Sequence, residues 1–128
     1  MRVLVVDDEY FLAETLAMVI RSAGHSVRTA YCAADASALA EDFRPDAVIA
    51  DVMMPDLSGL DLALWFGEHQ PDCRLLLVSG NPMMPELLEE CARRGYFRPI
   101  LPKPFHPHQV LDFLQSCART DKTGTPED

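Results

Sequence analysis

Three acids, a hydroxyl and an amine stand out in this chain as side chains that could act together: Asp7, Asp8, Asp51, Ser79 and Lys103. Carboxylates placed side by side repel one another, so a protein tolerates such a group only with a counter-charge nearby. Mg²⁺ would supply that charge, because it prefers oxygen ligands and takes one or two carboxylates while keeping several waters. An amine and a hydroxyl add a mobile cation and a small donor. Such a set is typical of phosphoryl transfer, in which positioning and charge stabilisation supply most of the catalysis.

Each of these residues also has a simpler interpretation. Asp7 and Asp8 could cap a helix, since acids favour helix N-termini. Asp51 could form an ordinary turn before a proline-containing loop, and Ser79 begins a stretch with turn composition, Ser-Gly-Asn-Pro. Lys103 could be a solvated loop lysine. The functional interpretation therefore depends on where the secondary structure places all five.

Short apolar runs alternate five times with longer amphipathic stretches. The expected strands are Arg2–Val6, Ser26–Ala30, Asp46–Asp51, Cys73–Val78 and Pro99–Leu101. The expected helices are Tyr10–Ala23, Ala33–Phe43, Gly59–His69, Pro85–Arg94 and His106–Ala118. This alternation predicts an α/β fold with a parallel five-stranded sheet and helices on both faces.

The carboxyl ends of the strands are where ligands bind in such sheets. Asp7 and Asp8 follow the first expected strand, Asp51 ends the third, and Ser79 and Lys103 follow the fourth and fifth. We therefore expect them to meet in one crevice. Asp51 lies between the acidic pair and the cationic side, which makes it the candidate nucleophile for forming an acyl phosphate.

Composition limits the other possibilities. The chain has 128 residues, the size of one domain, and a formal net charge of -9, with 11 Lys and Arg against 20 acids. We therefore expect no nucleic-acid surface as its main feature. Neither an export signal nor a membrane span is expected, because the N-terminal apolar run Val3–Val6 is too short. The four cysteines are scattered without a C-x-x-C pair, which favours buried apolar roles over a zinc or redox site. With no export signal expected, we expect a cytoplasmic location.

Four stretches of the chain, together spanning almost its whole length, resemble a response-regulator receiver domain of two-component signalling. They are VLVVDDE at 3–9, DVMMPDLSG at 51–59, LLLVSG at 75–80 and LPKPF at 101–105. The resemblance implies a flavodoxin-like, doubly wound (βα)5 fold with strand order 2-1-3-4-5. It assigns residues 1–118 to the receiver domain and leaves 119–128 as a polar tail.

The same resemblance implies roles for the site residues. Asp51 would be the phosphoacceptor. Asp8, Asp51 and the backbone carbonyl of Met53 would bind Mg²⁺, with Asp7 acting nearby through water. Lys103 would pair with the phosphoryl oxygens. The protein would assist its own phosphorylation and dephosphorylation rather than turn over another substrate.

Further implications of the resemblance concern neighbouring positions. Ser79 would move to hydrogen-bond the phosphoryl group after transfer. The Lys103–Pro104 bond would be cis, as an X-Pro bond can be, and Gly59 would permit the turn into the third helix.

One position departs from the family pattern. The family often has Tyr or Phe three residues before the lysine, where this chain has Ile100. An isoleucine can fill a hole but has no ring to swing between two environments. Tyr96 or Phe97 could take over this role or could simply pack.

We therefore hold three hypotheses. The first is a stand-alone receiver that accepts phosphate from a sensor histidine kinase or histidine phosphotransfer protein. Its fourth helix, fifth strand and fifth helix would then control a downstream protein or relay phosphate, as a monomer or weak dimer. The second, motivated by Ile100 and the proline-rich loops, is a receiver-like interaction module that does not switch. The third is a small phosphatase or other flavodoxin-like enzyme, for which the sequence supplies no second nucleophile.

Overall fold

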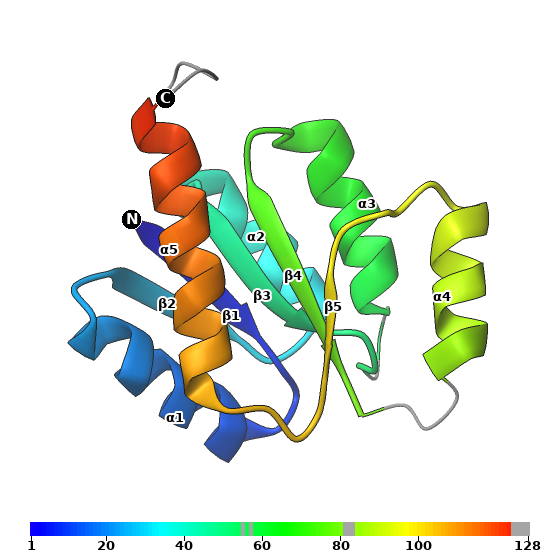
Figure 1. Cartoon of the computed structure of the whole chain (residues 1–128), viewed down its shortest axis with the longest axis horizontal. Coiled ribbons are helices and arrows are strands. Elements are labelled where there is room, and N and C mark those ends of the chain that lie inside the picture. The colour runs from blue at the N-terminus through cyan, green and yellow to red at the C-terminus, as the bar shows by residue number, and fades with distance from the viewer. Residues whose placement is uncertain (55, 57, 81–83, 124–128) are drawn as a thin grey trace.

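Five strands and five helices alternate along the chain. The structure, a computed structural model, describes the backbone of residues 1–54, 56, 58–80 and 84–123 (Figure 1). The strands are β1 (Arg2–Val6), β2 (Ser26–Ala30), β3 (Ala47–Asp51), β4 (Arg74–Ser79) and β5 (Ile100–Pro102). The helices are α1 (Tyr10–Ser22), α2 (Ala33–Phe43), α3 (Gly59–His69), α4 (Met84–Arg93) and α5 (Pro107–Thr123).

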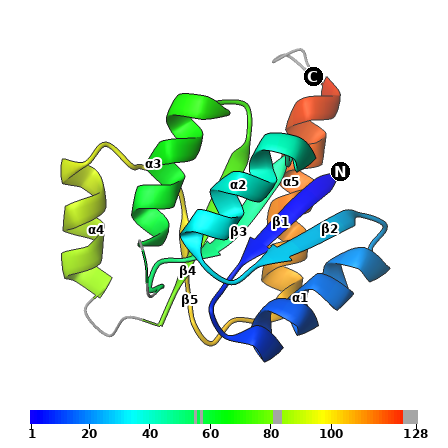
Figure 2. The ribbon, with the colours of Figure 1, turned by 180° about the vertical axis from the view of Figure 1, so that it is seen from behind.

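All the strands are parallel, in the order β2-β1-β3-β4-β5 (Figure 2). Val5 of β1 is paired with Thr29 of β2 on one side and with Ile49 of β3 on the other. The strand order reverses between β1 and β3. The predicted fold and strand order are therefore confirmed.

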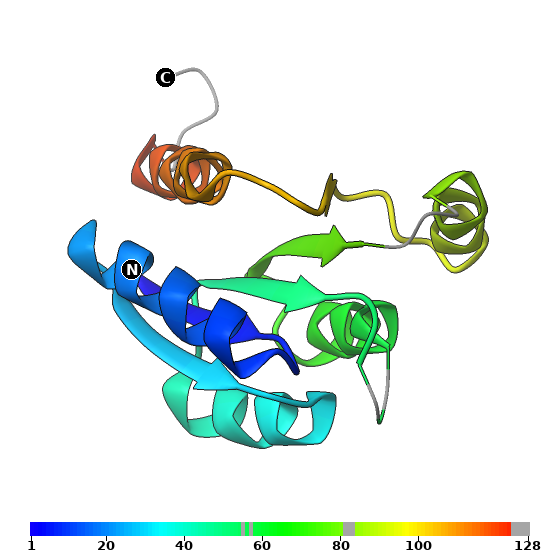
Figure 3. The same ribbon diagram turned by 90° about the horizontal axis from the view of Figure 1, so that it is seen from below.

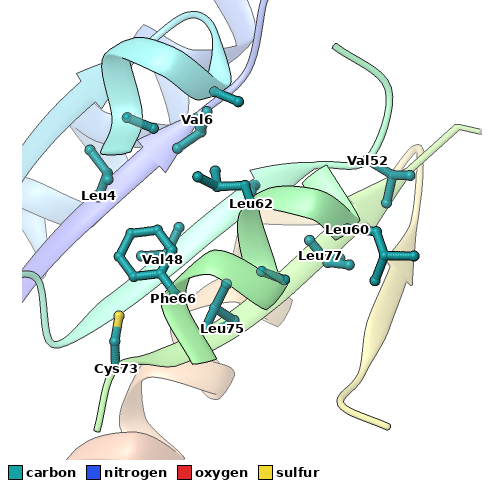
Figure 4. Packing of buried hydrophobic residues seen from close by; sticks show 14 of the residues in the cluster. Leu4, Val6, Val48, Val52, Leu60, Leu62, Phe66, Cys73, Leu75 and Leu77 are labelled. Atoms are coloured by element: carbon teal, nitrogen blue, oxygen red, sulfur yellow. The ribbon is translucent and has the colours of Figure 1, made fainter. Parts of the chain in front are cut away.

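Each face of the sheet is covered by helices, as the view along the layers shows (Figure 3). Residues of α1 and α5 form one hydrophobic cluster, with Ile20 and Leu114 fully buried against the sheet. Residues of α2, α3 and α4 form the other cluster, in which Phe66 of α3 lies among Leu4, Val48 and Leu75 (Figure 4). β3 is buried throughout, which explains why its sequence is almost continuously apolar.

Local sequence determines where several helices begin and end. Gly24, with φ of +99°, follows α1, and such a φ is readily adopted only by glycine. Arg44 caps the end of α2 in the left-handed region, at φ 52°, directly before Pro45. Ser58 begins α3 with a capping box, since its hydroxyl accepts a hydrogen bond from the Asp61 amide at 3.1 Å.

Some predicted boundaries were wrong. α5 continues to Thr123 instead of ending at Ala118, because residues 119–123 contain neither proline nor glycine. β4 includes Ser79, which was expected to follow it, and β5 begins at Ile100 rather than Pro99. The suggested turn at residues 79–82 and the end of the tail, 124–128, lie partly or wholly outside the described residues. Within the described part of the chain, no helix is long and apolar enough to cross a membrane.

Candidate functional site

The carboxyl edge of the sheet brings the predicted site residues together. Asp7 directly follows β1, Asp51 and Ser79 are the last residues of β3 and β4, and Lys103 directly follows β5. Asp51 and Ser79 lie on neighbouring strands, since Asp51 is paired with Val78. Residues far apart in sequence therefore meet where the order of the strands reverses, as the sheet rule predicts.

Lys103 is the central cation of this site. Its Nζ lies 2.9 Å from Oδ2 of Asp51, 3.1 Å from Oδ2 of Asp7 and 3.4 Å from Oε1 of Glu9. Its side chain is only 17% exposed. Burial acts to lower the pKa of Lys103, but its hydrogen bonds to Asp51 and Asp7 and the charges of those acids outweigh burial and raise it. The amine therefore stays protonated at neutral pH, and the solvated-loop interpretation is wrong.

The three acids form a compact cluster. Oxygen atoms of Asp7, Asp8 and Asp51 all lie within 4.8 Å of one another. Asp7 and Asp51 are buried, while Asp8 is exposed. Desolvation raises the pKa of Asp7, and the charge of Asp51 adds to this effect. Clustered carboxylates with one face open to solvent suit a hard divalent cation, so the residues present fit Mg²⁺.

The acidic pair does not act as a helix cap. The N-cap of α1 is Glu9, and it makes no side-chain capping bond. Instead, Oδ1 of Asp7 accepts a hydrogen bond from the Glu9 amide at 2.9 Å, while the Asp7 amide donates to the carbonyl of Ala30 at 3.1 Å. These bonds fix Asp7 at the end of β1 with its other oxygen directed at Lys103.

Asp51 is held by its own loop. The Met53 amide donates to Oδ1 of Asp51 at 3.1 Å, which leaves Oδ2 to Lys103. The Met53 side chain is 58% exposed, so its role here belongs to its backbone. Asp51 is not a free turn former, because it ends a central strand and both its oxygens have partners.

Gly59 is required because a side chain at this position would clash with the backbone of Asp51, not because the turn has an unusual φ. A Cβ atom at this position would lie 2.2 Å from the carbonyl oxygen of Asp51 and 2.9 Å from Cα of Val52. The Gly59 amide donates to the carbonyl of Val52 at 2.8 Å. The first residue of α3 therefore packs directly against the backbone of Asp51, which only glycine permits.

Ser79 is 1% exposed and lies at the end of β4. Its carbonyl oxygen accepts a hydrogen bond from the Lys103 amide at 2.8 Å, and its partner in β5 is Pro102. The backbone thus places its hydroxyl and the Lys103 amine on adjacent strand ends. The Lys103–Pro104 peptide bond is cis, as expected.

Sequence reasoning missed Glu9 as a partner of Lys103. The signal was present, because Glu9 directly continues the acidic run that follows β1. Its side chain is 66% exposed, so its ion pair with Lys103 is weaker than the buried ones.

The residues that could replace the family's aromatic side chain near β5 lie in different environments. Ile100 is half-buried and packs against the cluster beneath α3 and α4. Tyr96 is buried in that cluster, where burial raises the pKa of its hydroxyl, and it donates to the Pro99 carbonyl at 3.3 Å. Phe97 is 80% exposed. Tyr96 therefore packs in the core, and Phe97 lies at the surface.

Known proteins share both the sequence and the fold. The chain is 35% identical over 122 residues to the "Probable transcriptional regulatory protein TcrX" of Mycobacterium tuberculosis, covering 95% of this chain and 50% of that protein. It is similar to the chemotaxis response regulator CheY4 of Vibrio cholerae, with a TM-score of 0.76, 30% identity, and coverage of 91% and 97%.

A CheY-like receiver domain protein of Methanospirillum hungatei has a TM-score of 0.84 at 21% identity, with 95% of this chain and 97% of that chain covered. At that identity the likeness shows the fold alone. The chain spans about half the length of the first curated relative, TcrX. Residues 3–115 match the family described as "Response regulator receiver domain". The chain therefore belongs to the receiver domains of the response regulators of two-component signalling.

Proposed function

We propose that this receiver domain accepts a phosphoryl group on Asp51 in a reaction that depends on a divalent cation. One observation carries the proposal: Nζ of Lys103 lies 2.9 Å from Asp51, beside a cluster of three carboxylates whose oxygens are within 4.8 Å of one another. A fixed cation bonded to one carboxylate of an acidic cluster matches the charge distribution of phosphoryl transfer.

The chemistry is a direct displacement at phosphorus. A carboxylate oxygen of Asp51 forms the new bond to phosphorus while the bond from phosphorus to the donor, such as a phosphohistidine nitrogen, breaks. The donor nitrogen keeps the electron pair of that bond. Lys103 neutralises charge on the transferred oxygens because its amine already lies at hydrogen-bond distance from Asp51.

Asp8, Asp51 and the backbone carbonyl of Met53 would hold Mg²⁺, with Asp7 acting through water. The cation would stabilise negative charge on the phosphoryl oxygens. Asp7 also orients Lys103 through the 3.1 Å bond between its Oδ2 and Nζ. The raised pKa of Asp7 reflects the cost of burying this charge, which a bound cation would offset.

Ser79 would report the phosphorylated state. Phosphorylation replaces the single charge of Asp51 by about -1.5 to -2 and adds strong acceptor oxygens, which would draw in the Ser79 hydroxyl. Because Ser79 is bonded through its backbone to Lys103, both would shift together. The resulting change would reach the surface formed by α4, β5 and α5, and would favour one of two pre-existing states.

Receiver domains interact with histidine kinases, and we propose a sensor histidine kinase or a histidine phosphotransfer protein as the phosphoryl donor here. The downstream partner is proposed to be a protein that binds the α4-β5-α5 surface or accepts the phosphoryl group in a relay. TcrX bears the name of a transcriptional regulator, so this relative does not support the expectation of no nucleic-acid partner.

Labelling with a small-molecule phosphodonor tests the proposal. Acetyl phosphate with MgCl₂ should add one phosphoryl group to the wild-type chain, seen by intact-mass spectrometry, and hydroxylamine should remove it. Asp51→Asn should abolish the label, and EDTA should prevent it. Asp35→Asn, which alters an exposed acid in α2, is the matched control and should label normally. Undiminished labelling of Asp51→Asn would overturn the assignment.

A specific observation supports the second hypothesis, a module that binds partners without switching. Ile100 occupies the position of the family's mobile aromatic residue, and Tyr96 is fixed in the core. Beryllofluoride with Mg²⁺ separates the two hypotheses in a ¹⁵N spectrum. A switching receiver should show shifted amides across α4, β5 and α5, whereas a static module should show shifts only beside Asp51.

A further inference from the structure

The first turn of α2 lacks a cap of its own. Its N-cap residue is Cys32, which makes no side-chain capping bond although its backbone is extended, with φ -155° and ψ 165°. The first amides of a helix have no partner within the helix and need an acceptor from elsewhere. Cysteine is a poor acceptor, so this helix depends on another part of the chain.

Asp56 provides the missing acceptors from the loop between β3 and α3. The Ala33 amide donates to Oδ1 of Asp56 at 3.1 Å, and the Ala34 amide donates to Oδ2 at 2.9 Å. Both carboxylate oxygens are thus used on adjacent amides of another element. Such charge-assisted bonds are stronger than neutral ones, and a negative charge at a helix N-terminus is further favoured by the helix dipole.

This contact joins α2 to the loop that holds the proposed phosphoacceptor. The loop is fixed at its base by the bond from the Met53 amide to Asp51 and by the bond from the Gly59 amide to Val52. Asp56 adds an attachment farther along the loop. Asp56 thereby restrains the loop at a second place, beyond Met53.

The α2 side of the contact is itself connected to the acidic cluster. The Ala30 carbonyl accepts a hydrogen bond from the Asp7 amide at 3.1 Å, and only Tyr31 and Cys32 separate Ala30 from the first turn of α2. The two segments that carry Asp7 and Asp51 are therefore connected through Lys103 and through Asp56, in addition to the direct pairing of β1 with β3.

We propose that Asp56 is a positioning residue for the phosphorylation site. By fixing the loop to the N-terminus of α2, it holds the Met53 backbone where its carbonyl can bind the divalent cation together with Asp8 and Asp51. The inference rests on the proposed function, because it assumes a cation at the acidic cluster. Asp56 touches neither the cation nor the phosphoryl group and acts through the loop.

The alternative is that Asp56 only stabilises α2. Two variants separate these roles. Asp56→Ala removes both the cap and the attachment of the loop. Adding Cys32→Ser to Asp56→Ala returns a cap to α2, because serine at an extended N-cap position accepts a bond from the helix's own amides. The double variant therefore has a capped helix but a detached loop.

Two measurements are made on the whole chain without any phosphodonor: the affinity for Mg²⁺ by calorimetric titration with MgCl₂, and stability by urea unfolding. Asp56→Ala should weaken Mg²⁺ binding about 10-fold, the typical effect of losing support for a metal ligand. It should also lower the urea midpoint. The double variant should recover the midpoint but keep the weakened Mg²⁺ affinity.

Loss of one negative charge could also weaken cation binding, and a matched pair controls for this. Asp56→Asn and Asp35→Asn each remove one charge near the start of α2, but only the first alters a residue that bonds the loop to the helix. Asp56→Asn should weaken Mg²⁺ binding less than Asp56→Ala, since the amide oxygen still accepts one bond. Asp35→Asn should bind Mg²⁺ as the wild type does.

The Mg²⁺ affinities of these variants decide whether Asp56 is a positioning residue. Recovery of Mg²⁺ affinity in the double variant, or equal affinity of Asp56→Ala and wild type, would overturn the positioning role. An Asp35→Asn effect as large as that of Asp56→Asn would also overturn it, because charge alone would then explain the loss. Failure of the wild type itself to bind Mg²⁺ would instead contradict the proposed cation site.

Discussion

The backbone amide of Lys103 donates a hydrogen bond to the carbonyl oxygen of Ser79 at 2.8 Å. This bond extends the pairing of β4 and β5 by one residue past the end of β5, so the amine and the hydroxyl of the site are neighbours by virtue of the sheet. Gly80, the next residue after β4, also lies near Lys103, since a Cβ atom at this position would contact the Lys103 side chain at 3.8 Å. Any displacement of the end of β4 must therefore move Lys103 as well.

Lys103→Ala should have different consequences with and without Mg²⁺. Without the cation, the buried Asp7 and Asp51 would lose their shared counter-charge, and the free energy of unfolding should fall by about 2 kcal/mol, as for lost hydrogen bonds to charged groups. Mg²⁺ should raise the urea midpoint of the variant more than that of wild type. Arg98→Ala, at an exposed position before β5, is the control. Equal responses to Mg²⁺ in Lys103→Ala and wild type would contradict the shared-charge interpretation.

Two glycines of α3 should respond oppositely to alanine. Gly59→Ala places a Cβ 2.2 Å from the Asp51 carbonyl oxygen, so the backbone of the proposed phosphoacceptor must shift. We expect a loss of about 1–3 kcal/mol, typical of overpacking, and slower labelling by acetyl phosphate. Gly67→Ala meets nothing within 4 Å and should stabilise the helix by about 0.5–1 kcal/mol. Urea unfolding and timed intact-mass spectrometry measure both effects.

The residues that meet at the carboxyl edge could be predicted because each one ends or follows a strand of the sheet. The apolar runs locate the strands, and parallel pairing then determines which ends are close. Asp56 could not be found in this way. Its partners Ala33 and Ala34 belong to another element, and a loop residue's long-range contacts leave no periodic signal in the sequence.

The end of α5 shows a second limit of prediction. The polar residues 119–123 were expected to leave the helix, but polarity alone does not end a helix that lacks proline and glycine. Likewise, glycine at position 59 suggested a turn, whereas the reason for it is the approach of the Asp51 carbonyl. A single sequence shows that a glycine is present but not which atoms surround it.

The pH dependence of stability should reveal the link between α3 and Arg94, the residue that follows α4. Arg94 donates a hydrogen bond to Asp61. This bond, together with smaller contributions from the Ser58 hydrogen bonds, holds the pKa of Asp61 below its usual value of 3.8 despite partial burial. A carboxylate with a lowered pKa in the folded state stabilises the protein above the unfolded pKa and loses this effect as the pH falls through the folded value. Asp61→Asn should therefore lower the urea midpoint at pH 7.

The difference between wild type and Asp61→Asn should shrink below about pH 4 and vanish at more acid pH. It should remain small throughout, under about 1 kcal/mol, because the pair is partly exposed. Arg94→Met should lower the stability only by the contribution of the ion pair, since the hydrogen bonds between Asp61 and Ser58 stay intact. A difference that is constant down to pH 2.5 would show that the charge of Asp61 is not responsible.

The cysteines should differ in reactivity in the folded protein. Burial, with a contribution from the Asp46 charge, raises the pKa of Cys73 to about 12, so its reactive thiolate is scarce at pH 8. Cys91 and Cys117 are also buried, while Cys32 is only half-buried. Iodoacetamide at pH 8 should label Cys32 first, and the other three only after unfolding in urea. Peptide mass spectrometry locates the labels, and early alkylation of Cys73 would contradict its burial.

The brevity of β5 has a consequence for behaviour at high concentration. This outermost strand has three residues, and its last, Pro102, has no N–H to offer on the open side. A long, flat strand at a sheet margin would be a template for strands of other molecules, whereas a short one ending in proline resists such pairing. Restoring an N–H to this edge by Pro102→Val should favour aggregation.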